Sequence, residues 1–102
     1  MTSAMTPELA QDYLATLWVD LRGVAVLDGT GARLAGDEAL ATRAAALMAG
    51  VPAGEARRAS DSASVIYAVR SGSHAIAVSV GSEALEAVVI GDLLAVLADL
   101  DA

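Results

Sequence analysis

Three apolar runs, separated by short breaks that contain glycine and serine, dominate the second half of this chain. They cover residues 65–70, 74–80 and 85–90. Runs of this length with Gly and Ser at their ends are typical of β-strands, and short breaks between them are typical of antiparallel neighbours. The pattern therefore predicts a three-stranded antiparallel meander.

The middle run alternates between large and small side chains. Successive side chains of a strand point to opposite faces of its sheet, so one face is bulky and the other is not. The two sets are Ile76, Val78 and Val80 against Ala75, Ala77 and Ser79. The third run carries apolar groups on both faces. We therefore expect a sheet covered by helices on both sides, with a close helix approach on the small face.

The first half of the chain predicts a helix followed by a β-hairpin. Thr6 and Pro7 are typical of a helix start, and we expect the helix over residues 7–22, with Gly23 as its stop. The turn Asp28-Gly29-Thr30-Gly31 favours a tight reversal between strands at 24–27 and 32–35. The apolar stripe predicted for this helix is Leu9, Tyr13, Leu14, Leu17, Trp18 and Leu21.

Two more helices and a loop complete the prediction. Asp37 can cap a second helix over residues 38–49, which Gly50 ends. Residues 51–63 contain Pro and Gly and are predicted to form a loop, with at most one helical turn. Gly91 and Asp92 open a short final helix over residues 93–100.

The predicted order is helix, two strands, helix, three strands, helix. This is an α+β fold, with a five-stranded antiparallel sheet and helices on both of its faces. A chain of 102 residues makes one domain, residues 1–102, of which we expect 1–5 to be disordered.

The charge and the cysteine count exclude several classes of function. The net charge is −7 and the chain has no Lys, whereas nucleic-acid binding needs clustered cations. The absence of Cys excludes disulfides and thiolate metal sites. No signal-peptide or membrane-span pattern is found. We expect a cytoplasmic protein without membrane insertion.

The charge is unevenly distributed. Residues 1–22 carry −2 and residues 83–102 carry −5, whereas residues 23–82 are balanced. If the two ends of the chain share one layer, that layer is acidic and repels a second copy. The neutral middle is then the better surface for self-association.

No set of residues predicts catalysis, a cofactor or a metal. Gly29-Thr30-Gly31 lacks the Lys of a phosphate loop, and Ser73-His74 lacks the Gly that a nucleophile elbow requires. His74 is the only His, so a His-based metal site is excluded, while a role as a pH switch stays open. Glu83 and Glu86 could act as an acid and a base only if they were buried together.

Arg57-Arg58-Ala59-Ser60 resembles the target of a basophilic kinase. The simpler interpretation is a flexible polar loop. Phosphorylation of Ser60 stays open at this point.

The whole pattern resembles the Roadblock / dynein light chain family, and in particular its bacterial stand-alone domains. The motifs run from about Leu9 to Leu100, and the short final helix and the loop at 52–63 depart from the family. The residues that carry the resemblance are Arg22-Gly23, Val24-Ala25-Val26-Leu27-Asp28-Gly29, Arg33-Leu34-Ala35, the Ala/Leu-rich helix after them, Ala75 to Gly81, Ser82-Glu83-Ala84-Leu85 and Val88-Val89-Ile90.

The resemblance implies an arrangement and a kind of partner. The first and third helices would share one sheet face, and the second would cover the other. Members form homodimers or heterodimers through their second helices and adjoining middle strands, and act as scaffolds or regulators of small Ras-like GTPases. On this basis we expect a non-enzymatic homodimer with contacts at Ala45, Met48, Val65, Tyr67 and Val69, and no cofactor.

Two other classes of function are alternatives for a chain of this pattern. A small-molecule sensor of PAS-like or profilin-like architecture would hold its ligand between the sheet and a helix. An enzyme is disfavoured, because no acid, base and nucleophile converge.

Overall fold

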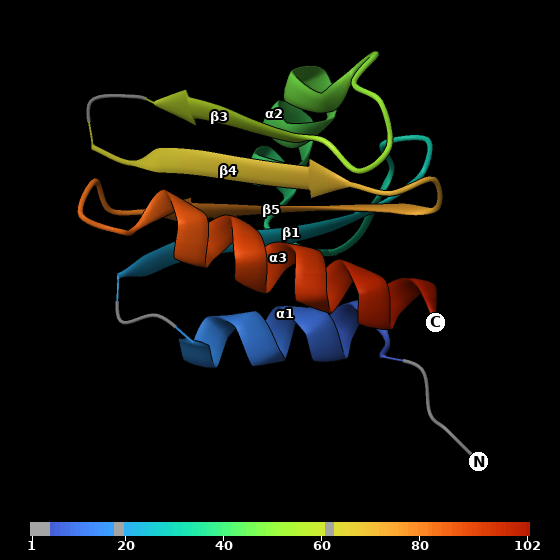
Figure 1. The fold of residues 1–102 in the computed structure, drawn as a ribbon, viewed down its shortest axis with the longest axis horizontal. Coiled ribbons are helices and arrows are strands. Elements are labelled where there is room, and N and C mark those ends of the chain that lie inside the picture. The colour runs from blue at the N-terminus through green and yellow to red at the C-terminus, as the bar shows by residue number, and fades with distance from the viewer. Residues whose placement is uncertain (1–4, 18–19, 61–62) are drawn as a thin grey trace.

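The computed structural model describes residues 5–17, 20–60 and 63–102 (Figure 1). The strands form one antiparallel sheet in the order β2-β1-β5-β4-β3. The elements in chain order are α1 (Pro7–Leu17), β1 (Leu21–Asp28), β2 (Arg33–Gly36), α2 (Glu38–Met48), β3 (Ala56–Ser60), β4 (Val65–Arg70), β5 (His74–Val80) and α3 (Glu86–Asp101).

The sheet is the middle of three layers. In Figure 1, α1 and α3 lie side by side and antiparallel on one face, and α2 lies behind the sheet on the other. The predicted α+β class, with a five-stranded antiparallel sheet and helices on both faces, is confirmed. No helix in the described part of the chain has the length and apolar content needed to cross a bilayer.

The two sheet faces differ in the size of their side chains. The face under α1 and α3 carries Ile76, Val78 and Val80 from β5 and similarly large groups from β1 and β4. The face under α2 carries Ala77 and, from the neighbouring strands, Ala25 and Ala68. The predicted split of β5 is therefore confirmed. Two helices cover the bulky side, whereas one alanine-rich helix suffices on the small side.

The helix that covers the small face begins as predicted. The backbone N–H of Leu40 donates to Oδ1 of Asp37 at 2.8 Å, so Asp37 is the N-cap of α2. α2 then buries its own small residues Ala41 and Ala44 against the sheet. Gly50, with φ of +75°, follows the end of the helix.

The identity of the third strand of the meander was predicted wrongly. Residues 85–90 are not a strand, because Leu85 caps α3 and the next residues form its first turns. Their alternation belongs to a longer helical pattern in which Val89, Leu93 and Val96 are buried on one side. The final helix is therefore 16 residues long rather than short, and Gly91 lies within it.

The missing strand lies in the segment that was predicted to be a loop. Residues 56–60 form β3, which pairs with β4 along its whole length. The number and order of strands are unchanged by this exchange. An edge strand needs no continuous apolar run, and the exposed Arg57 and Arg58 hid it from a search for apolar alternation.

The first helix is shorter than predicted, and its buried side is different. α1 ends at Leu17, and Leu21 already pairs with Val80 at the start of β1. Ala10 and Leu14 are its fully buried residues, whereas Leu9 and Tyr13 are about half exposed. Trp18 and residues 1–4 lie outside the described residues, and Met5 packs against the core.

Gly36 fixes the corner between β2 and α2. Its φ is +92°, and a Cβ built on it would lie 2.1 Å from the carbonyl oxygen of Val24. That carbonyl accepts a hydrogen bond from the N–H of Asp37 at 2.8 Å. The corner therefore holds the capped start of α2 against β1, and only glycine fits there.

We predict that Gly36→Ala lowers the free energy of unfolding by about 2 kcal/mol, because it adds both a clash and a strained φ. The matched control is Gly91→Ala in α3, where the new methyl group meets no atom within 4 Å. This control should raise stability by about 0.5 to 1 kcal/mol, since alanine favours a helix. Urea denaturation of the three proteins measures both effects. Shifts of the same sign for both variants would contradict the prediction.

Candidate functional site

The free edge of β3 is the first feature that could contact a partner. The sheet order makes β3 and β2 the two edge strands of the described sheet. The outer edge of such a strand offers unpaired backbone N–H and C=O groups. β3 is five residues long and largely exposed, with Ala56 and Ala59 partly buried against the two cores. It can therefore accept one more antiparallel strand.

The outer side of α2 is the second feature. α2 contacts β3, so the helix and the strand edge belong to one continuous surface. The exposed side chains of α2 are mostly small, which allows another helix to approach closely. We call this region the α2/β3 surface, defined by β3 and by the exposed residues of α2 and its end, Glu38, Ala39, Thr42, Arg43, Ala46 and Ala49.

Four of the five residues predicted as dimer contacts are buried within the described chain. Val65, Tyr67 and Val69 lie on the sheet face covered by α1 and α3, and Met48, the last residue of α2, packs into the core between that helix and the sheet. Only Ala45 is partly exposed. A strand paired on both sides cannot extend a sheet, and β4 lies between β3 and β5. A continuous sheet between two copies would therefore have to use an edge strand, β3 or β2, rather than residues 65–70.

The two helix layers differ in charge. α1 carries Glu8 and Asp12, α3 carries four carboxylates, and neither helix contains Lys or Arg. The arginines of the middle segment include Arg43, which is exposed on α2, and the two in β3. The acidic ends of the chain thus share one layer, which makes that layer acidic. The α2/β3 surface is the more neutral side.

The β1–β2 turn has a structural explanation. Oδ1 of Asp28 accepts hydrogen bonds from the Thr30 N–H at 2.8 Å, the Thr30 hydroxyl at 2.6 Å and the Ala32 N–H at 3.0 Å. The Thr30 hydroxyl, followed by the backbone N–H groups, lowers the pKa of Asp28. Gly31 supplies the positive φ of the turn. These hydrogen bonds and the positive φ of Gly31 close the hairpin.

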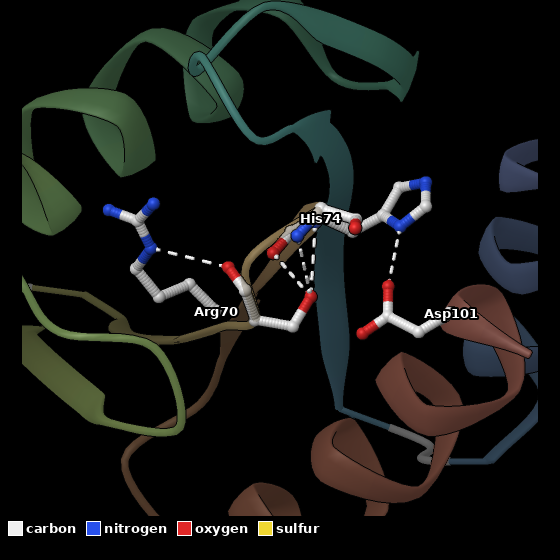
Figure 2. Close-up of polar contacts among 5 residues, drawn as sticks. Arg70, His74 and Asp101 are labelled. Atoms are coloured by element: carbon white, nitrogen blue, oxygen red, sulfur yellow. Dashed lines mark hydrogen bonds and ion pairs between the residues drawn. The ribbon is translucent and has the colours of Figure 1, made fainter.

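A polar cluster ties the β4–β5 hairpin to the end of α3 (Figure 2). Nδ1 of His74 lies 2.8 Å from Oδ1 of Asp101. In the hairpin, Oγ of Ser71 accepts from the backbone N–H groups of Ser73 and His74 at 3.3 and 3.1 Å. Ser73 and His74 are therefore turn residues, and His74 joins two elements that are distant in sequence.

The carboxyl group of Asp101 is held in its charged form. Partial burial raises its pKa, but hydrogen bonding from Ser71 and His74, together with the charge of His74, outweighs this and leaves the pKa below its ordinary value of 3.8. The interaction between His74 and Asp101 stabilises the fold only modestly, because both side chains keep contact with water.

A cleft lies beside this cluster, between the C-terminal half of α2 and the β1–β2 turn. Its volume is about 240 Å³, and its walls include Gly31, Ala45 and His74. Arg70 also lines it, and its Nη1 lies 3.5 Å from the carbonyl oxygen of Met48 at the end of α2. A cation is favourable at that end of a helix. Drug-sized ligands occupy about 300 to 1,000 Å³, so this cleft suits only something smaller.

The other residues that the sequence offers as chemical sites are exposed. Glu83 and Glu86 are both on the surface, and Glu86 lies 3.7 Å from Nε of Arg58. They are therefore not the buried pair that acid–base chemistry would need. Ser60 is exposed at the end of β3, and its phosphorylation stays a prediction. Within the ranges that the structure describes, no three potential ligands lie close enough to hold a metal ion.

Comparison with known proteins does not assign this chain to a family. No protein-family model matches the chain, and no curated protein matches it. The Roadblock resemblance accordingly stays a prediction that rests on the motifs quoted from the sequence.

Two features of the site were missed in the sequence. The open edge of β3 was read as a loop, although Ala56 and Ala59 mark its two faces within a polar segment. The contact between His74 and Asp101 joins residues 27 apart. It could be found only by placing α3 correctly, since neither residue has a local signal.

We predict that Asp101→Asn costs about 1 kcal/mol of stability near pH 6, and that its difference from the wild type shrinks toward about pH 3. A lowered pKa means that the charged carboxylate stabilises the fold above its ordinary pKa of 3.8, and that this contribution is lost as the pH falls through the lower folded-state value. Urea denaturation at both pH values measures the difference. Asp99→Asn, on the same helical turn but without a side-chain hydrogen bond or ion pair to any described residue, is the control and should change little. A difference that grows on acidification would refute the assignment.

Proposed function

We propose that this protein is a non-enzymatic scaffold that forms a homodimer and regulates a small Ras-like GTPase, as its resemblance to the Roadblock / dynein light chain family implies. The observation that carries the proposal is the α2/β3 surface. An open strand edge beside a helix with small exposed side chains is suited to self-pairing, because the sheet can continue while the helices approach closely.

The charge distribution supports the same surface. Two copies that met through α1 and α3 would bring two acidic layers together. Two copies that met through the α2/β3 surface would avoid this repulsion and leave the acidic layers pointing outward.

The element order adds further support. The sequence departed from the family in its short final helix and in its loop at 52–63. The final helix is in fact 16 residues long, and that segment contains β3, which supports the resemblance in element order.

The alternative, a small-molecule sensor of PAS-like or profilin-like architecture, has less support. The cleft beside α2 does lie between a helix and the sheet, as that function would require. However, its volume of about 240 Å³ is below the usual range for organic ligands, and Arg70 is already turned toward the end of α2.

We predict that the protein sediments as a dimer at low micromolar concentration and that Ala46→Glu shifts it toward monomer. Ala46 is exposed on α2, and a carboxylate there would face its own copy across a two-fold axis. Ala15→Glu, also exposed but on α1, is the matched control and should leave the dimer intact. Sedimentation velocity distinguishes the outcomes. A wild-type protein that is only monomeric, or a dimer lost in the Ala15 variant alone, would contradict the proposed interface.

We further predict that the wild-type dimer, used as bait, retains a GTP-binding protein from a lysate of its source organism, and that retention differs between GDP and a non-hydrolysable GTP analogue. The Ala46→Glu monomer should retain at least about tenfold less, because the dimer presents the binding surface. Mass spectrometry identifies the retained proteins. If a proven dimer retains no GTP-binding protein with either nucleotide, the GTPase part of the proposal fails.

A further inference from the structure

Exposed apolar side chains gather on the layer formed by α1 and α3. Six large apolar residues in the described part of the chain are more than a third exposed, and only Leu34 of β2 lies outside this layer. The other five are Leu9 and Tyr13 of α1, Leu85 at the cap of α3, and Val88 and Leu94 of α3 itself. Single exposed apolar residues are ordinary, but five of six in one layer indicate a contact surface.

These residues are spaced along both helices. Leu9 and Tyr13 are four apart and lie on one side of α1, while Leu85 and Val88 are three apart at the start of α3. Because the two helices are antiparallel neighbours, the two pairs belong to opposite ends of the layer (Figure 1). A segment that lay along the layer would therefore meet apolar side chains toward both of its ends.

The charge of the layer formed by α1 and α3 indicates which kind of partner it can bind. α1 and α3 carry six carboxylates and no Lys or Arg. Glu86 is paired with Arg58 and Asp101 with His74, whereas the other four have no ion pair with any residue that the structure describes. A second copy of this chain and an anionic lipid surface would both be repelled. Lys and Arg of a partner would be attracted.

We propose that the outer face of α1 and α3 binds a cationic amphipathic segment of another protein. Its apolar side chains would cover Leu9, Tyr13 and Val88, and its Lys and Arg residues would pair with the acidic groups around them. This binding does not depend on dimerisation through the α2/β3 surface, so the two proposals can fail separately.

The test uses a synthetic amphipathic helix of about 16 residues that combines Leu with Lys, and a matched peptide in which Glu replaces Lys. Titration followed by ¹⁵N amide shifts should show binding of the Lys peptide only, with the changes confined to α1 and α3. The Ala46→Glu variant should bind the Lys peptide as well as the wild type does.

The double variant Leu9→Ser/Tyr13→Ser tests whether binding needs the exposed apolar side chains or only charge attraction. It should weaken binding about tenfold while leaving the net charge unchanged. Leu34→Ser, which removes the exposed apolar group outside the layer, should have no effect. Equal affinity for the double variant and the wild type would overturn the proposal, as would shifts centred on α2 and β3. Self-association that is lost in the double variant would show that the layer serves a second copy instead.

Discussion

The alternation of large and small side chains along β5 governs how this molecule is assembled. β5 is the central strand, and its two faces decide what can cover the sheet on each side. Valine and isoleucine fill the wide space under α1 and α3, whereas alanine at position 77 leaves room for one helix to approach closely. The buried side of α2 combines Ala41 and Ala44 with the larger Leu40 and Met48. The small residues on both sides of this contact allow the helix to pack closely on the sheet.

Charge then separates the two sides of the molecule. The excess of negative charge lies at both ends of the chain, and the fold brings α1 and α3 together in one layer. Nothing in the core requires this, since acidic groups on the solvent side of a helix do not affect packing. The arrangement disfavours contact between two α1/α3 layers and leaves the opposite side more neutral. If both proposed contacts exist, they would use different faces and would not compete for the same surface.

The sequence predicted the class, the first hairpin and α2, because these depend on local signals such as the Asp37 cap and the Asp28 turn. The number of strands was right only because two errors, at residues 56–60 and 85–90, cancelled. It failed where a local pattern fits two structures. The segment Leu85–Ile90 alternates like a strand, but Val89 and Leu93 also fit a helix, and the longer helical pattern prevails because it buries more apolar surface. β3 was missed because it carries no apolar pattern of its own. An edge strand of this kind derives its stability from pairing with β4 rather than from its own apolar content. The contact between His74 and Asp101 depends on the placement of α3.

The composition of β3 also constrains how strongly two copies can associate. Arginines on an edge strand usually oppose pairing with another chain, and both Arg57 and Arg58 are exposed there. Each has an acidic neighbour, Glu55 at 3.6 Å and Glu86 at 3.7 Å, which removes part of that repulsion. These ion pairs are exposed and weak, so the strand edge alone offers little affinity. The small side chains of α2 must therefore contribute the apolar contact, and neither element would hold a dimer together without the other.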